Sequence, residues 1–131
     1  MKKSIKPTDG ELSILQILWQ HGPLSVRIVN EMLSEQYKEE IGYTTTLKLM
    51  QIMTDKGLVK RNTDQRSHIY EPVVKEHETQ QNLLSEFLNA TYRGSASTLV
   101  LQALGQHQSS KEELKKIKEF IASLESKSNN K

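Results

Sequence analysis

Apolar residues recur at intervals of three and four along most of the chain, which is the spacing of one face of an α-helix. Thr8 and Glu11 form a capping-box pattern that predicts the start of a first helix, and His21-Gly22-Pro23 predicts its end. A second helix is predicted from a cap at Ser25 to about Tyr37. The inner faces expected for these two helices consist of Leu12, Leu15, Leu18 and Trp19, and of Ile28, Val29, Met32 and Leu33.

The segment 42–59 has the most informative pattern. It predicts a helix from about Thr44 to Lys56, which Gly57 ends. One face of this helix is apolar and is expected to pack inward, while the other is polar. Short hydroxyls, an amide and an ammonium at the front of an exposed helix suit the edge of a DNA major groove. The apolar face holds Leu49, Ile52 and Met53, with Thr45 or Thr46 at its start, and the polar face holds Tyr43, Thr44, Lys48, Gln51 and Asp55.

Two β-type runs follow, at 58–62 and 67–73, and a polar turn at 63–66 separates them. This pattern predicts a β-hairpin with a basic tip. Three helices followed by a hairpin predict a winged helix-turn-helix. The expected fold class is therefore mainly α with a small β-hairpin wing.

A second helical region is predicted after Pro72, with apolar side chains on broad faces. We expect a winged-helix domain at 1–75, a helical dimerisation domain at 76–126 and a disordered tail at 127–131. A domain of about 50 residues rarely holds a core alone, so a second subunit is expected to cover its apolar faces. The residues expected at this dimer interface are Leu84, Phe87, Leu88, Leu99, Val100, Leu104, Ile117 and Ile121.

The polar helix face alone is equally consistent with an ordinary solvated surface. The hairpin behind it favours DNA, because a wing places cations beside the phosphate backbone. Arg27, at the start of the second helix, is expected either at a phosphate or in solvent. His68 is expected to help the wing touch DNA. The full set of expected DNA-binding residues is Arg27, Tyr43, Thr44, Thr45, Lys48, Lys60, Arg61, Arg66 and His68.

Composition excludes several functions for the 131-residue chain. The absence of cysteine excludes disulfides and thiolate metal sites, and the four scattered histidines do not have metal-ligand spacing. We find no nucleophile motif or phosphate loop, so neither an enzyme nor a cofactor is expected. The sequence lacks a signal peptide and any apolar run that could span a bilayer, which favours a cytoplasmic protein. The net charge of +2 is mild, and the basic excess lies in the first half.

Several stretches, in this order, resemble the penicillinase and methicillin-resistance repressor family (BlaI/MecI/CopY type). The resemblance covers nearly the whole chain, and the order and spacing of the motifs make it specific. The stretches are 11–19, 22–29, Tyr43-Thr44-Thr45 with Leu47 and Leu49, 56–59, the wing 66–72, Gly94-Ser95, Leu99-Val100-Leu101 and 110–114.

The resemblance implies a winged-helix repressor that dimerises through its C-terminal helices. It also implies an operator with inverted repeats, often of TACA/TGTA type. In β-lactam-responsive members a membrane sensor protease acts as antirepressor, and the cut falls at Asn-Phe after the Leu-Val-Leu motif. Gln102 and Ala103 stand at those positions here, which argues against that route. The Cys-X-Cys pairs of copper-responsive members are absent, which argues against copper sensing of that type.

Two functions follow as hypotheses. The first is a homodimeric transcriptional repressor that binds inverted-repeat operator DNA through the third helix and the basic wing. The alternative is a winged-helix protein–protein interaction module without sequence-specific DNA binding, because a fold alone does not determine function. Binding to random duplex DNA at low salt distinguishes the two.

Overall fold

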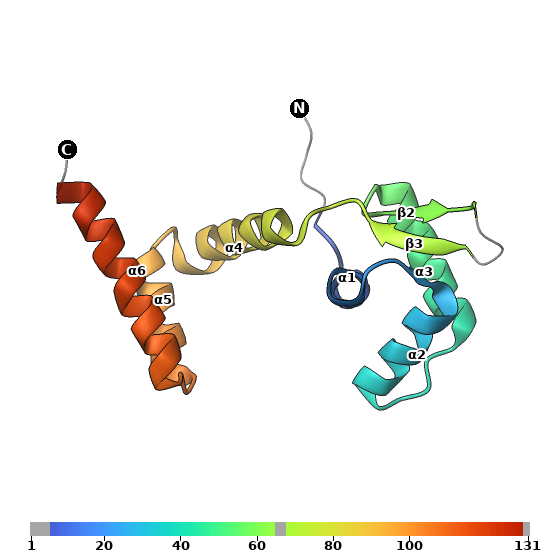
Figure 1. Cartoon of the computed structure of the whole chain (residues 1–131), viewed down its shortest axis with the longest axis horizontal. Helices are drawn as coiled ribbons and strands as arrows, with labels where there is room; N and C mark the ends of the chain where they lie inside the picture. The colour runs from blue at the N-terminus through green and yellow to red at the C-terminus, as the bar shows by residue number, and fades with distance from the viewer. Residues whose placement is uncertain (1–5, 65–67, 130–131) are drawn as a thin grey trace. The chain divides into compact units, whose positions relative to one another are not determined.

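The computed structural model describes residues 6–64 and 68–129, and it divides the chain into two compact units, 1–84 and 85–131. The fold is mainly helical with one small sheet, as the sequence predicted (Figure 1). The elements are α1 (Asp9–His21), β1 (Leu24–Ser25), α2 (Val26–Tyr37), α3 (Tyr43–Lys56), β2 (Val59–Asn62), β3 (Ile69–Pro72), α4 (Glu76–Tyr92), α5 (Ala96–Gln106) and α6 (Lys111–Asn129).

The ends of the first three helices follow local chemistry. At α1 the capping box is present, since the Thr8 hydroxyl accepts from the Glu11 N–H and the Glu11 carboxylate accepts from the Thr8 N–H. Ser25 caps α2 by accepting from the Ile28 N–H at 3.3 Å. Gly57 ends α3 with φ of 82°, in the left-handed region that glycine adopts without strain.

The sheet has three antiparallel strands in the order β1-β3-β2. The β2–β3 hairpin was predicted, and the structure confirms it. Strand β1 was not expected from the sequence; in it Leu24 pairs with Tyr70 and Ser25 with Ile69. This third strand directly precedes α2 and pairs with β3 of the wing. It therefore links the helices of the first unit to the hairpin.

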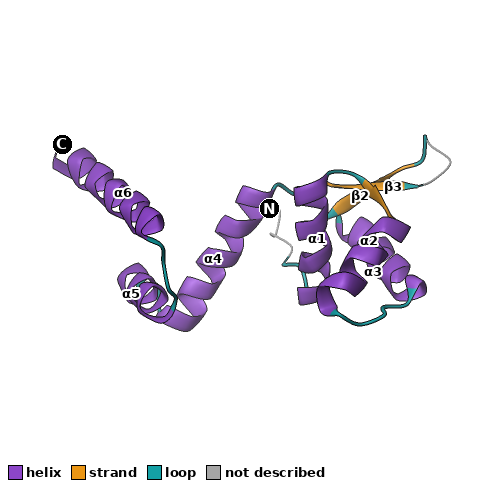
Figure 2. Cartoon of the chain, turned by 60° about the horizontal axis from the view of Figure 1, so that its bottom comes forward, coloured by secondary structure: helices purple, strands orange, loops and turns teal. Residues whose placement is uncertain are grey.

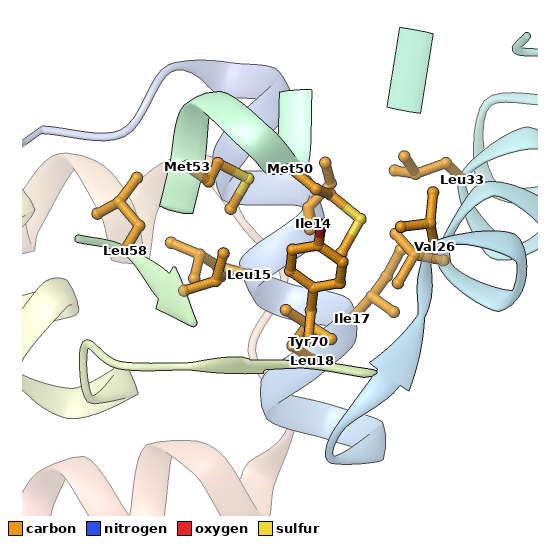
Figure 3. Close-up of a cluster of buried hydrophobic side chains, with 12 residues drawn as sticks. Ile14, Leu15, Ile17, Leu18, Val26, Leu33, Met50, Met53, Leu58 and Tyr70 are labelled. Atoms are coloured by element: carbon orange, nitrogen blue, oxygen red, sulfur yellow. The ribbon is translucent and has the colours of Figure 1, made fainter. Parts of the chain in front are cut away.

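The core of the first unit surrounds α1 and includes side chains from α2, α3 and the sheet (Figure 3). Ile14 and Ile17 are buried, whereas Leu12 and Trp19, which were expected on the inner face, are only partly covered. The Trp19 indole N–H donates to the Val74 carbonyl at 3.0 Å. The buried apolar residues are Ile14, Leu15, Ile17, Leu18, Val26, Val29, Leu33, Met50, Met53, Leu58, Val59 and Tyr70.

Two residues expected in the inner faces lie outside the core. Ile28 and Ile52 are both exposed, although each falls at the helical spacing of a buried residue. Each sits at the margin of its apolar stripe, where Val29 and Met53, one position along, take the buried place. A spacing of three to four residues identifies the apolar face of a helix. It does not decide which of two neighbouring residues at the edge of that face is buried.

The second unit consists of the end of α4 with α5 and α6. The unit boundary falls after Leu84, inside α4, and not at residue 75 where the sequence analysis expected a domain boundary. Thr79 in the first half of α4 is buried, which fits with that half belonging to the first unit. Helix α6 continues to Asn129, so 127–129, which were expected in a disordered tail, are helical. Within the described residues, we find no helix long and apolar enough to cross a bilayer.

Candidate nucleic-acid interface

Helix α3 presents a polar front to solvent. Tyr43, Thr44, Thr45 and Lys48, all predicted to contact DNA, are exposed. Thr46 is fully buried. The inward-facing threonine at the helix start, which the sequence left open, is therefore Thr46, and Thr45 is available at the surface.

The opposite face of α3 is fixed by apolar packing. Met50 and Met53 are fully buried beneath the helix, and Leu47 and Leu49 are partly buried against the same core. Figure 2 shows α3 in the same group of helices as α1 and α2, with the β2–β3 hairpin beside them. A helix held this firmly along one face presents its other face as a rigid surface.

Side chains from α2, α3 and the three strands meet around a hollow beside the start of α3. Arg27 of α2, Tyr43 of α3, Arg61 of β2 and His68 before β3 all line it. Ser25, Val26, Leu47 and Tyr70 complete the wall, and none of the described lining residues is acidic. The structure therefore brings together four of the residues that were predicted to bind DNA. A hollow lined by two guanidinium groups and no carboxylate attracts anions such as phosphate.

The cations predicted to bind DNA differ in their surroundings. Lys60 pairs with Glu71, its cross-strand neighbour, at 3.0 Å. The Lys60 side chain is well exposed, and surface ion pairs contribute only about 0–1 kcal/mol to stability. A phosphate can therefore replace Glu71 as the partner of the Lys60 ammonium at little cost in free energy. Arg27 has a longer contact of 3.6 Å with Glu31 on its own helix, and both side chains are exposed. Arg66 lies outside the described residues.

An ion pair that the sequence analysis did not predict joins α1 to the end of α3. The Lys56 ammonium lies 3.0 and 2.9 Å from the two carboxylate oxygens of Glu11, whose side chain is buried. Burial by itself raises the pKa of Glu11. Hydrogen bonds from the Thr8 backbone and the Lys56 ammonium outweigh this effect, so the pKa lies below its ordinary value of 4.5. The capping-box pattern identified Glu11, but nothing local to it indicated a partner 45 positions away.

A second polar link that the sequence analysis missed joins α2 to the start of α3. The Asn30 side-chain amide donates to the Ile41 carbonyl at 2.9 Å and to the Thr46 hydroxyl at 2.8 Å. The Ser34 hydroxyl accepts from the Ile41 N–H at 3.1 Å. Asn30 is half-buried next to the buried Val29, and its contacts depend on how α2 meets α3, which the spacing of residues along α2 does not reveal.

The described residues contain no group of three His, Asp or Glu side chains close enough to hold a metal ion. The titratable groups of the interface are instead spread along its surface. The hollow contains His68, and none of its described lining residues carries a carboxylate. The arrangement is suited to binding an extended polyanion.

The chain is similar in sequence to proteins of one known family. A family model described as penicillinase repressor matches residues 7–123. The penicillinase repressor of Bacillus licheniformis is 27% identical over 122 residues, which cover 92% of this chain and 93% of that protein. The transcriptional regulator BlaI of Mycobacterium tuberculosis is 35% identical over 74 residues, 56% of this chain and 52% of BlaI.

Solved structures show a similar fold. The structure of H. salinarum RosR is 16% identical, with a TM-score of 0.51, and the match covers 95% of this chain and 98% of RosR. At this identity the likeness supports the fold alone. The family model, by contrast, matches most of the chain, from the residue before the α1 cap into α6. The chain therefore belongs to the penicillinase repressor family.

Proposed function

We propose that this protein is a homodimeric transcriptional repressor that binds inverted-repeat operator DNA. The observation that carries the proposal is the exposed polar front of α3 beside the hollow lined by Arg27, Tyr43, Arg61 and His68. Membership of a family whose curated relatives are named as repressors supports it. The protein would act in the cytoplasm, where operator DNA lies, and catalysis has no part in this function.

In this proposal α3 enters the major groove. Thr44, Thr45 and Lys48 reach base edges, because hydroxyl, methyl and ammonium groups at the front of a helix can meet the donors, acceptors and thymine methyls there. Arg27, Tyr43, Arg61 and His68 hold the backbone phosphates on either side. Lys60 joins them by leaving its exposed pair with Glu71. Arg66 is proposed as a further phosphate contact on sequence grounds alone.

The proposed dimer rests on the second unit. Among its described residues none is buried, and several large apolar side chains of α5 and α6 are exposed. A second copy of the chain that covered these side chains would give the unit a core. The proposed interface includes the exposed Leu84, Phe87, Val100 and Ile121 and the partly covered Leu88, Leu99, Leu104 and Ile117.

A two-fold dimer explains why the operator would be an inverted repeat. Each chain offers one α3, and the two helices of a dimer enter major grooves one helical turn, about 34 Å, apart. The DNA half-sites then carry the same two-fold symmetry as the protein. Repression follows when the bound dimer occupies the site that the polymerase needs.

The proposal does not extend to induction by a membrane sensor protease acting at residues 102–103. Gln102 and Ala103 lie inside α5, and the Tyr92 hydroxyl donates to the Gln102 side-chain carbonyl at 2.9 Å. A helical segment must unwind before a protease can bind it as an extended strand. The Asn-Phe sequence that the β-lactam-responsive relatives cut is also replaced here.

A titration of the full chain with duplex DNA tests the function. The probes are a duplex selected by the protein from a random pool and a scrambled duplex of the same length and composition. We expect tight binding to the first, weak binding to the second, and a loss of both as salt rises. If neither duplex is bound at low salt, the proposal is wrong and a protein-interaction module becomes the better account.

A further inference from the structure

The loop that leads into α3 is held by two side chains of α2 that lie one helical turn apart. Asn30 and Ser34 have the i, i+4 spacing that places side chains on the same face of a helix. Ser34 accepts from the Ile41 N–H, while Asn30 donates to the carbonyl of the same residue. Both backbone polar groups of Ile41 are thus bound by α2, immediately before the recognition helix begins.

Asn30 also reaches the start of α3. The N-cap residue of α3 is Gly42, which has no side chain to accept from the first turn. The Asn30 amide N–H groups donate to the Gly42 carbonyl at 3.4 Å and to the Thr46 hydroxyl at 2.8 Å, so they tie the first turn of α3 to α2 without taking the place of an N-cap. Thr46 is fully buried, so its hydroxyl needs a partner inside the protein.

We propose that Asn30 is a positioning residue for sequence recognition, which acts by fixing the front of α3 through Thr46 and the 41–42 backbone. This inference rests on the proposed function and deepens it. The residues at the front, Thr44 and Thr45, directly precede the anchored Thr46. A change in the Asn30 contacts therefore displaces the side chains assigned to base edges first.

The inference predicts a selective effect, because the two classes of DNA contact tolerate displacement differently. Hydrogen bonds to base edges need donor–acceptor distances of about 2.7–3.2 Å with good alignment. Phosphate contacts from long cationic side chains are electrostatic and adapt to small shifts. Loss of the Asn30 contacts should therefore lower specific binding far more than non-specific binding.

The opposite end of α3 provides a matched control. Glu11 holds Lys56 in the last turn, about 20 Å along the helix axis from its first turn. Glu11→Gln weakens a polar anchor of the same helix without touching the front. It separates an effect of helix position at the groove from an effect of lower stability.

The experiment compares the affinity of four variants of the full chain for the selected duplex and for the scrambled duplex. Each titration is run well below the unfolding midpoint of that variant. We expect Asn30→Ala to lower affinity for the selected duplex about tenfold, which corresponds to about 1.4 kcal/mol. Binding to the scrambled duplex should change less than about twofold, as expected for contacts to phosphate alone.

Variants of the partner residue keep the test valid if Asn30→Ala folds poorly. Thr46→Val removes the hydroxyl but keeps the shape, and should lower the ratio of specific to non-specific affinity. Thr46→Ser keeps the hydroxyl and should preserve the ratio. Glu11→Gln should lower the unfolding midpoint and preserve the ratio.

Two results would overturn the inference. One is an unchanged ratio in both Asn30→Ala and Thr46→Val, and the other is an equal fall of the ratio in Glu11→Gln. If the wild-type chain does not distinguish the two duplexes, the proposed function itself fails, and the role assigned to Asn30 fails with it. If the wild-type chain distinguishes the two duplexes and the Asn30 and Thr46 variants distinguish them equally well, only the positioning role is overturned.

Discussion

The two units of the chain differ in where they keep their apolar side chains. In the first unit, Ile14, Leu15 and Met50 are completely buried around α1 and α3. In the second, Leu101 of α5 is 70% exposed and Phe120 of α6 is 63% exposed. The same helical periodicity therefore gives a closed core in one unit and an open face in the other. The first unit encloses its own core, whereas the second leaves large apolar side chains at its surface.

Polar groups show the same contrast. The first unit buries Glu11 and Thr46, and both have hydrogen-bond partners contributed by another helix. Such links fix the orientation of one helix on another. In the second unit the hydrogen bond from the Tyr92 hydroxyl to the Gln102 side chain lies at the surface. We infer that the first unit is built to present a rigid surface and the second to pair with a copy of itself.

The largest effect is expected for Leu15→Ala, which creates a cavity at a completely buried position. The free energy of unfolding should fall by about 2–5 kcal/mol. Because the first unit folds on itself, the loss should not depend on protein concentration. Denaturant unfolding at two protein concentrations measures this. Val100→Ala is the comparison: its smaller loss should shrink on dilution, because dissociation of the proposed dimer removes the contact that the change weakens.

A charge on the exposed apolar face of α6 should abolish dimerisation, which is assigned to the second unit, without unfolding the first unit. Ile121→Asp places a carboxylate on the proposed dimer interface and should yield a folded monomer. Affinity for an inverted repeat should then fall about 100-fold, because two linked half-site contacts become independent. Sedimentation and titration measure both effects. Ser123→Asp, on the opposite side of the same helix, adds the same charge and should leave the dimer intact; an equal loss there would contradict the assignment of the face.

The ion pair between α1 and α3 makes the first unit sensitive to acid. The folded pKa of Glu11 lies below its ordinary value of 4.5, so the carboxylate stabilises the fold fully above about pH 4.5. That contribution is lost as the pH falls through the folded pKa. Glu11→Gln should lower the free energy of unfolding at neutral pH by about 1–3 kcal/mol. Thermal unfolding of the two proteins should converge as the solution is acidified, and curves that stay parallel would exclude the pair as the cause.

The smallest effect is expected for Arg61→Ala at the hollow beside α3. One lost phosphate contact should weaken binding to all duplexes by a similar factor. It should also reduce the slope of log affinity against log salt by about 1. Salt titrations with both duplexes measure this. Lys115→Ala removes one exposed charge from α6 in the second unit, and its slope should match that of the wild type.

The fold could be predicted from local patterns wherever local physics decides it. Thr8 and Gly57 mark helix ends because capping and left-handed backbone depend on neighbouring residues. Strand β1 was missed because it has only two residues and exists through pairing with Ile69 and Tyr70, far along the chain. No propensity within two residues signals such a strand.

The site was predictable in its exposed part and not in its supports. The polar face of α3 follows from helical spacing, so Thr44 and Lys48 were identified correctly as surface residues. The roles of Asn30 and of the Glu11–Lys56 pair depend on which helices meet, and sequence spacing does not contain that information. The contacts to DNA themselves stay predictions.

The central claim is that one unit reads DNA while the other pairs two chains on it. The most direct measurement is the mass of the complex between the full chain and the selected duplex, by sedimentation at protein concentrations above the dissociation constant. The account predicts two chains on each inverted repeat, and a much weaker complex with one chain on an isolated half-site. Equal affinity for the half-site and the full repeat, with one chain bound to each, would contradict it.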